Sequence, residues 1–262
     1  MYQVGTLQMK HAILRTVFYC VVLATTFLSG AASGNGCINC HSNPDFYVQD
    51  RKLYTYYQDY ITSPHKAAGL SCDFCHGGDP AATDKDTAHQ SILKITEPAS
   101  KLYYKNLPET CGACHSDKLA QFKQSKHFKA LMHEKSAPSC TTCHSAMRPR
   151  PHYRDIVKQS CRTCHFDQNP RNLPLVAGRA DEFLHRLSIA KVYLAWTTVF
   201  YEEQGWPFNS QQEIEGINRK YDEAVTRVHR FDLVMMDESS AEILAELEEM
   251  FKKAWDKRPK AE

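Results

Sequence analysis

The sequence predicts a mainly α-helical protein with two unlike parts, a loop-rich module of short helices and a C-terminal bundle of about three long helices. Ten of the 11 cysteines fall between Cys37 and Cys164, in a stretch broken by Gly- and Pro-rich turns. After Pro174 there are no cysteines, and apolar residues recur with helical spacing. We therefore expect three segments, 1–33, 34–172 and 173–262.

The first segment has the pattern of an export signal. Basic Lys10 and Arg15 precede an apolar run from Thr16 to Leu28, and small residues follow where a signal peptidase can cut. An uncleaved anchor is the alternative, but the run is short for a membrane span. We expect a periplasmic location, and the sequence leaves membrane attachment or the cell surface open.

One pattern, C-x-x-C-H, occurs five times. It is the sequence to which c-type haem is covalently attached: two thiols reach the two vinyl groups of a porphyrin, and the adjacent imidazole binds the iron. Zinc sites use C-x-x-C pairs in twos, and disulfides join cysteines in exported proteins. Neither alternative explains a histidine after every second cysteine. The sequence therefore predicts five covalently bound haem c groups.

This prediction assigns a role to each residue of the motifs. The thioether bonds are expected at Cys37, Cys40, Cys72, Cys75, Cys111, Cys114, Cys140, Cys143, Cys161 and Cys164. The proximal iron ligands are expected at His41, His76, His115, His144 and His165.

The other face of each iron needs a second ligand or stays open to substrate. Seven histidines outside the motifs and the signal are candidates: His65, His89, His127, His152, His133, His185 and His229. Seven candidates suffice to close all five irons, and bis-histidine ligation suits electron transfer.

Local context sorts these candidates. His65 and His133 each precede the next motif by the same spacing, H-x6-C-x-x-C-H. His127 competes with His133, because Ser125-Lys126-His127 repeats the Ser-x-His pattern around His65. His89 and His152 follow turn-forming stretches between motifs. His65, His89, His127 and His152 are therefore favoured. His185 and His229 lie on apolar helix faces, where a packed histidine is the ordinary interpretation.

The last segment is expected to form three amphipathic helices. The first spans Gly178 to Gln204 and carries His185 on an inward stripe with Val192. Ser210 and Ser239 each begin a capping-box pattern, which predicts the starts of the second and third helices. The three helices are expected to pack together, with an oligomer or docking surface as the second interpretation.

Charge divides between the two parts. Residues 34–172 contain 18 Lys and Arg against 13 Asp and Glu, whereas residues 173–262 contain 12 against 17. Five haems would add up to ten propionate charges to the first part. Its basic residues are therefore interpreted as propionate partners, and no nucleic-acid partner is expected.

On these motifs the chain resembles the bacterial multihaem cytochromes c. The Ser-x-His element after Cys111 to His115, and haem sites followed by long helices, look like those of the nitrite reductase and hydroxylamine oxidoreductase-like superfamily. Pentahaem nitrite reductases carry a C-x-x-C-K motif, and here every motif ends in histidine. The chain also resembles small pentahaem electron donors, which implies a quinol-oxidising membrane donor and a terminal reductase or cytochrome as acceptor.

Three functions are compatible with the sequence. The favoured one is an electron carrier with five closely packed haems and no catalytic residue. The second is a small reductase or oxidase of a nitrogen or sulfur oxyanion, in which one haem is open and His133, His185 or His229 serves the active site. The third is a haem subunit docked in a larger membrane redox complex.

Overall fold

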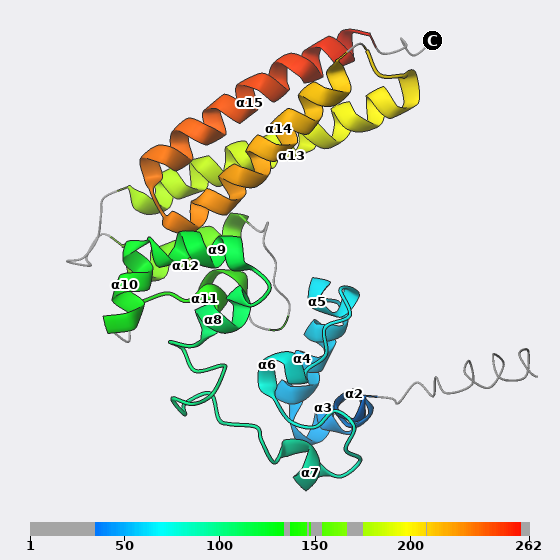
Figure 1. The fold of residues 1–262 in the computed structure, drawn as a ribbon, viewed down its shortest axis with the longest axis vertical. Helices are drawn as coiled ribbons and strands as arrows, with labels where there is room; N and C mark the ends of the chain where they lie inside the picture. Colours follow the sequence, from blue (N-terminus) through cyan, green and yellow to red (C-terminus); the bar gives the residue numbers. More distant parts are fainter. Residues whose placement is uncertain are drawn as a thin grey trace, which may run out of the picture.

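The computed structural model describes residues 35–133, 137–145, 147, 154–166, 175–207 and 209–257. These residues form helices and connecting turns without a strand, which confirms the predicted mainly α class. Figure 1 shows three groups of helices, which we call the N-terminal lobe, the middle lobe and the bundle. Among the described residues, no helix combines the length and apolarity that a membrane span requires. The predicted signal, 1–33, lies outside the described residues.

The N-terminal lobe consists of short helices joined by turns. They are α2 (Gly36–His41), α3 (Phe46–Gln49), α4 (Arg51–Ile61), α5 (Pro64–Ala67), α6 (Asp73–His76) and α7 (Lys85–His89). Such short helices depend on their caps, because they have few internal hydrogen bonds. The Asp50 carboxylate accepts from two backbone N–H groups at the start of α4. The Tyr60 hydroxyl donates to the Leu70 carbonyl at 2.7 Å and fixes α4 against the segment before α6.

The middle lobe contains five further short helices. They are α8 (Leu107–Gly112), α9 (Ser116–Lys123), α10 (Lys126–His133), α11 (Cys140–His144) and α12 (Arg154–Cys164). α8 and α9 approach closely at Gly112, where an added Cβ would lie 2.2 Å from Leu119 Cδ2. Glycine is therefore required at this position inside the third C-x-x-C-H motif.

The bundle is built from long helices with one hydrophobic core. They are α13 (Val176–Gln204), α14 (Ser210–Arg227), the 3-10 turn η1 (Val228–Arg230) and α15 (Leu233–Asp256). Each helix contributes buried residues at helical spacing, among them Leu187 from α13, Ile217 from α14 and Leu247 from α15. The three predicted long helices are thus confirmed.

The two predicted capping boxes in the bundle are wrong. α15 begins earlier than expected, because the Asp232 carboxylate accepts from the N–H groups of Val234 and Met235 at 3.1 and 3.3 Å. Ser239 is therefore interior to the helix, and its hydroxyl donates to the Met235 carbonyl. At α14 the N-cap is Asn209, and the Ser210 hydroxyl turns back to the Pro207 carbonyl at 2.7 Å.

The predicted inward stripe on α13 is also wrong. His185 is exposed, and Val192 is 63% exposed. The side of α13 that faces the core instead carries Phe183, Leu187 and Ala190. Apolar residues occur all round this helix, so its sequence did not define a single face.

Two sets of contacts join the bundle to the middle lobe. Lys158 of α12 forms a 2.7 Å ion pair with Asp181 of α13. Lys118 of α9 donates to the Thr226 hydroxyl of α14 at 3.0 Å, close to η1. The turn between α14 and α15 therefore lies against the middle lobe, as Figure 1 also shows.

Candidate functional site

The C-x-x-C-H sequences lie on short helices or at helix ends. α2 and α11 contain whole motifs, α6 contains most of one, the third spans the α8–α9 junction, and the fifth ends α12. Residues three and four apart share a helix face, so the two cysteines and the histidine of a motif project together. The ten cysteines are free thiols, and none of them is buried. Each motif thus presents two accessible thiols beside an imidazole.

Four of the five motif histidines lie near a second histidine from another segment. The distances between ring centroids are 6.2 Å for His41 and His89, 6.3 Å for His115 and His65, 6.0 Å for His144 and His229, and 6.1 Å for His165 and His127. These separations are nearly equal although the partners come from α5, α7, α10 and η1.

A haem iron fits this separation. A metal–nitrogen bond is about 2.0 Å long and the ring centre lies about 1.1 Å further, so imidazoles on opposite faces of an iron have centroids about 6.2 Å apart. Within the described residues, no three His, Cys, Asp or Glu side chains converge as a metal site made of protein alone requires. A haem needs less from the protein, because the porphyrin nitrogens fill the equatorial positions and only two axial ligands remain.

Two of the histidines that lie beside a motif histidine are held in the tautomer that binds a metal. His89 Nδ1 lies 2.7 Å from the Lys85 carbonyl, and His229 Nδ1 lies 3.1 Å from the Thr226 carbonyl. A carbonyl only accepts, so each Nδ1 carries the proton and Nε2 keeps a lone pair. Ligation through one ring nitrogen with the other donating to a carbonyl is usual at metal sites.

The surroundings favour the neutral form of five of the histidines. Burial lowers the pKa of His41, His65, His76, His127 and His229. The pKa of His127 falls to about 4, mainly through burial and further through His165. Both His127 and His165 have a buried Nδ1 without a hydrogen-bond partner among the described residues. Neutral imidazoles with an unused nitrogen are suited to bind iron.

The repeated Ser-x-His sequence is a helix cap that carries a histidine. The Ser63 hydroxyl accepts from Lys66 N at 3.1 Å and begins α5, which contains His65. The Ser125 hydroxyl accepts from Phe128 N at 3.0 Å before α10, which contains His127. Each histidine therefore sits in the first turn of a short helix whose start is fixed by a buried serine.

The sequence left open which motif each of these histidines faces. His65 lies just before the second motif but is placed beside His115 of the third. His127 lies before the fourth motif and is placed beside His165 of the fifth. His133, which shares the H-x6-C spacing with His65, is exposed at the end of α10.

The bundle contributes the partner of the fourth motif. His229 is in η1, at the turn that lies against the middle lobe, and its ring approaches His144. Two residues later the Phe231 ring lies 4.5 Å from the His127 ring, centroid to centroid. Phe231 has a left-handed backbone with a φ of 55°, which is unusual for a bulky residue. This turn therefore reaches two histidine pairs at once.

The second motif differs from the others. Among the described residues, no second imidazole makes a ring contact with His76. Of the remaining candidates, His133 and His185 are exposed. His152 lies outside the described residues.

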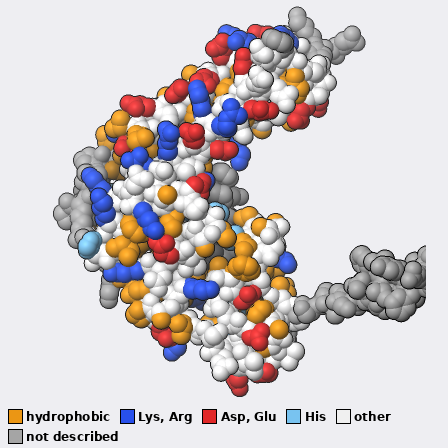
Figure 2. Space-filling view, viewed as in Figure 1, with side chains coloured by type: hydrophobic (Ala, Val, Ile, Leu, Met, Phe, Trp, Pro, Cys, Tyr) orange, Lys and Arg blue, Asp and Glu red, His pale blue; other side chains and the backbone are white. Residues whose placement is uncertain are grey.

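The surface of the N-terminal lobe supports the fit to haem. Its large hydrophobic side chains are exposed at Tyr47, Val48, Leu53, Tyr56, Ile61, Phe74, Ile92, Leu93 and Ile95. A protein rarely leaves so many apolar groups in water unless something covers them. Figure 2 shows such hydrophobic patches over the lobes, whereas acidic and basic side chains alternate over the bundle. Porphyrin faces attached at the nearby motifs would cover this surface.

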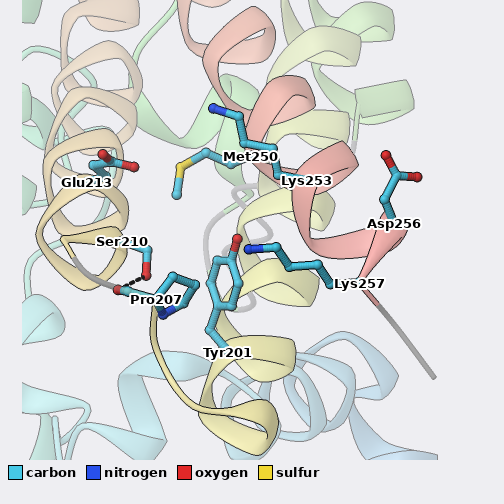
Figure 3. Close-up of a pocket in the computed structure, with 8 residues that line it drawn as sticks. All are labelled: Tyr201, Pro207, Ser210, Glu213, Met250, Lys253, Asp256 and Lys257. Atoms are coloured by element: carbon cyan, nitrogen blue, oxygen red, sulfur yellow. Dashed lines mark hydrogen bonds between the residues drawn. The ribbon is translucent and has the colours of Figure 1, made fainter.

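A pocket at the far end of the bundle has a different character. It has a volume of about 350 Å³ and lies between the ends of α13, α14 and α15. Figure 3 shows Lys253 and Lys257 at this pocket with Tyr201 and Met250, and no histidine or cysteine lines it. It is remote from the histidine pairs and has none of their chemistry.

Comparisons with known proteins agree with the haem-attachment motifs. Residues 97–166 match the family described as cytochrome c7 and related cytochrome c. The chain is also similar to the C-type polyheme cytochrome OmcB of Geobacter sulfurreducens, in strains DL-1 / KN400 and PCA alike. The two proteins are 26% identical over 120 residues, which is 42% of this chain. The match spans 14% of the length of these relatives. No solved structure matches the chain.

The matched family region contains the third, fourth and fifth motifs, one complete histidine pair (His127 with His165) and the motif histidines of two further pairs, His115 and His144. Together with the motifs, these matches support a multihaem c-type cytochrome with covalently bound haem c.

Proposed function

We propose that the chain is an exported pentahaem cytochrome that transfers electrons through closely packed haems with mostly bis-histidine ligation. The thiols of the five motifs bind the porphyrins and the motif histidines bind the irons from one face. The other face is closed by His89 opposite His41, His65 opposite His115, His229 opposite His144 and His127 opposite His165. When bound, each haem supplies an iron that gains and loses one electron.

The observation that carries this proposal is the set of four histidine pairs with centroids 6.0 to 6.3 Å apart. Two protein ligands leave no position for a substrate, so such sites exchange electrons without bond chemistry. The protein fixes the tautomer of His89 and His229, and burial favours the neutral form of His41, His65, His127 and His229.

The partners belong to the same proposal. Electrons come from a quinol-linked membrane donor and pass to a reductase or another cytochrome outside the cytoplasm. The match to a polyheme cytochrome and to the cytochrome c7 family supports redox partners of this general kind.

Mass and voltammetry test the proposal together. Intact-mass measurement of the exported protein should show five added haems. Protein-film voltammetry should then give reversible waves that integrate to five electrons per molecule and do not change when nitrite or hydroxylamine is added. A mass without haem, or waves that integrate to far fewer electrons, would contradict the proposal.

One observation favours a second candidate, the small reductase with one open haem. His76 is exposed, and no second imidazole makes a ring contact with it within the described residues. If the iron at this motif lacks a second ligand, nitrite or hydroxylamine should produce a catalytic current in the same films. That current should disappear in His76→Ala and persist in Arg230→Ala, which changes no iron ligand.

A further inference from the structure

We infer that the five attachment sites follow one another in space in their sequence order, so that the nearest neighbours of each site are the sites directly before and after it. The inference rests on the proposed function, because it takes each site to hold a haem. Sites 1 to 5 are the C-x-x-C-H sequences that begin at Cys37, Cys72, Cys111, Cys140 and Cys161.

Sites 1 and 2 are joined by two hydrogen bonds. The Asn35 side chain, which caps the helix of site 1, donates to the hydroxyl of Ser71, the residue before site 2. Gly36 N donates to the carbonyl of Pro80, which follows site 2, at 2.7 Å. A Cβ on Gly36 would lie 2.2 Å from the Ala82 carbonyl oxygen, so the approach depends on glycine.

Sites 2 and 3 are joined through one short segment. Its helix α5 places His65 beside His115 of site 3. Leu70 N donates to the His65 carbonyl at 3.0 Å, and the thiols of site 2 begin two residues later. The chain between His65 and Cys72 is therefore compact, and it brings site 2 next to site 3.

The remaining sites are joined by packing of their own helices. α8 of site 3 packs against α11 of site 4. α11 in turn packs against α12 of site 5, and the Ser160 hydroxyl donates to the Thr142 carbonyl at 2.9 Å. Ser160 directly precedes Cys161, and Thr142 lies inside site 4.

The thiols repeat this order. The Cys72 thiol of site 2 lies near the Cys37 thiol of site 1, the Cys75 thiol of site 2 lies near the Cys114 thiol of site 3, and the Cys143 thiol of site 4 lies near the Cys161 thiol of site 5. The Cys111 and Cys140 thiols of sites 3 and 4 are hydrogen-bonded to each other. Each pair of successive sites therefore has neighbouring attachment groups.

The direction of the series is visible in Figure 1, where α2 and α6 lie in the N-terminal lobe, α8 and α11 in the middle lobe, and α12 against α13 of the bundle. Five sites in such a row have two ends. Site 1 is the end away from the bundle and site 5 is the end beside it, so a donor and an acceptor that dock at opposite ends exchange electrons across all five sites.

Nuclear Overhauser contacts between haems in the fully reduced protein test the order. Reduced bis-histidine haems are diamagnetic, so contacts between protons of neighbouring porphyrins are observable. Two matched variants assign them: Cys37→Ala with Cys40→Ala removes the haem of an end site, and Cys111→Ala with Cys114→Ala removes that of the middle site. The end variant should lose one of four inter-haem contacts, and the middle variant should lose two.

Loss of two or more contacts in the end variant, or a contact between non-successive sites stronger than those between successive ones, would overturn the inference. If a double variant does not fold, single substitutions such as Cys37→Ala keep one thioether and shift the signals of one haem, which assigns the same contacts. A wild-type mass without haem contradicts the proposed function itself, whereas five haems in another order contradict only the inference.

Discussion

The bundle and the N-terminal lobe are stabilised in different ways. In the bundle, 14 buried residues form one cluster, with Leu247 and Ala254 fully buried. In the N-terminal lobe the large buried hydrophobic residue is Tyr60, whereas nine large hydrophobic side chains are exposed. The bundle therefore has a protein core, and the lobe has the surface of a core whose other half is the bound cofactor. We therefore expect the bundle to fold without haem and the N-terminal lobe to depend on haem attachment.

Blocking haem attachment should separate the two regions most strongly. When the whole chain is produced without haem attachment, we expect the helices of the N-terminal lobe, α2 to α7, to lose amide protection almost completely, because the exposed apolar groups of this lobe have no partner. The bundle should keep protected amides in α13, α14 and α15. Hydrogen exchange with mass spectrometry measures both regions in one sample, and equal protection of the two would contradict the comparison.

A core substitution in the bundle should lower the stability of the bundle without affecting haem attachment. Leu247→Ala removes a fully buried side chain and should cost about 2–5 kcal/mol of unfolding free energy. Denaturant unfolding followed by helical circular dichroism measures this cost, while the haem content per molecule should not change. The matched control is Val192→Ala, which alters an exposed apolar residue and should cost less than about 0.5 kcal/mol.

The turn at η1 is where the bundle meets the haem-binding part of the chain, at the middle lobe, so His229→Ala sharpens the comparison. One of the five irons should lose its low-spin signal, because the imidazole opposite His144 is removed, while the helices of the bundle remain. His229→Met should restore a low-spin iron with a raised reduction potential. Arg230→Ala in the same turn is the control, and an equal spectral change there would refute the assignment.

The smallest expected effect is at a helix cap. Ser125→Ala removes the acceptor for Phe128 N and should cost about 1 kcal/mol, since α10 is short and depends on this cap. The readout is a shift of the electron paramagnetic g-values of the iron at His165, whose partner His127 follows the cap. Ser125→Thr keeps the hydroxyl and should leave the g-values unchanged; a shift in both variants would contradict the positioning role.

The sequence predicted the features that depend on local patterns. The C-x-x-C-H motifs, the Ser-x-His repeat and the three long helices each arise within a few helical turns, where spacing determines which side chains share a face. The exceptions among local features are the capping boxes at α14 and α15 and the inward stripe on α13. Ser239 matched the capping pattern, but Asp232 caps the helix earlier and leaves Ser239 in its interior.

The histidine partners could not be predicted in the same way. Which imidazole meets which motif depends on contacts between distant segments, so the sequence left the pairing open, and the fold places His65 beside His115. His229 matched an ordinary apolar helix face, and only the docking of η1 on the middle lobe brings it to His144. The Ser-x-His repeat was the one sequence signal that favoured His127 over His133 as an iron ligand.

Electron paramagnetic resonance of the oxidised, haem-loaded protein tests the central claim most directly. With haem content fixed by the pyridine haemochrome assay, integration should assign at least four of the five irons to low-spin ferric signals, one for each histidine pair. Two or more high-spin irons in the native protein would contradict the account, because at least one of the four pairs would then not hold an iron.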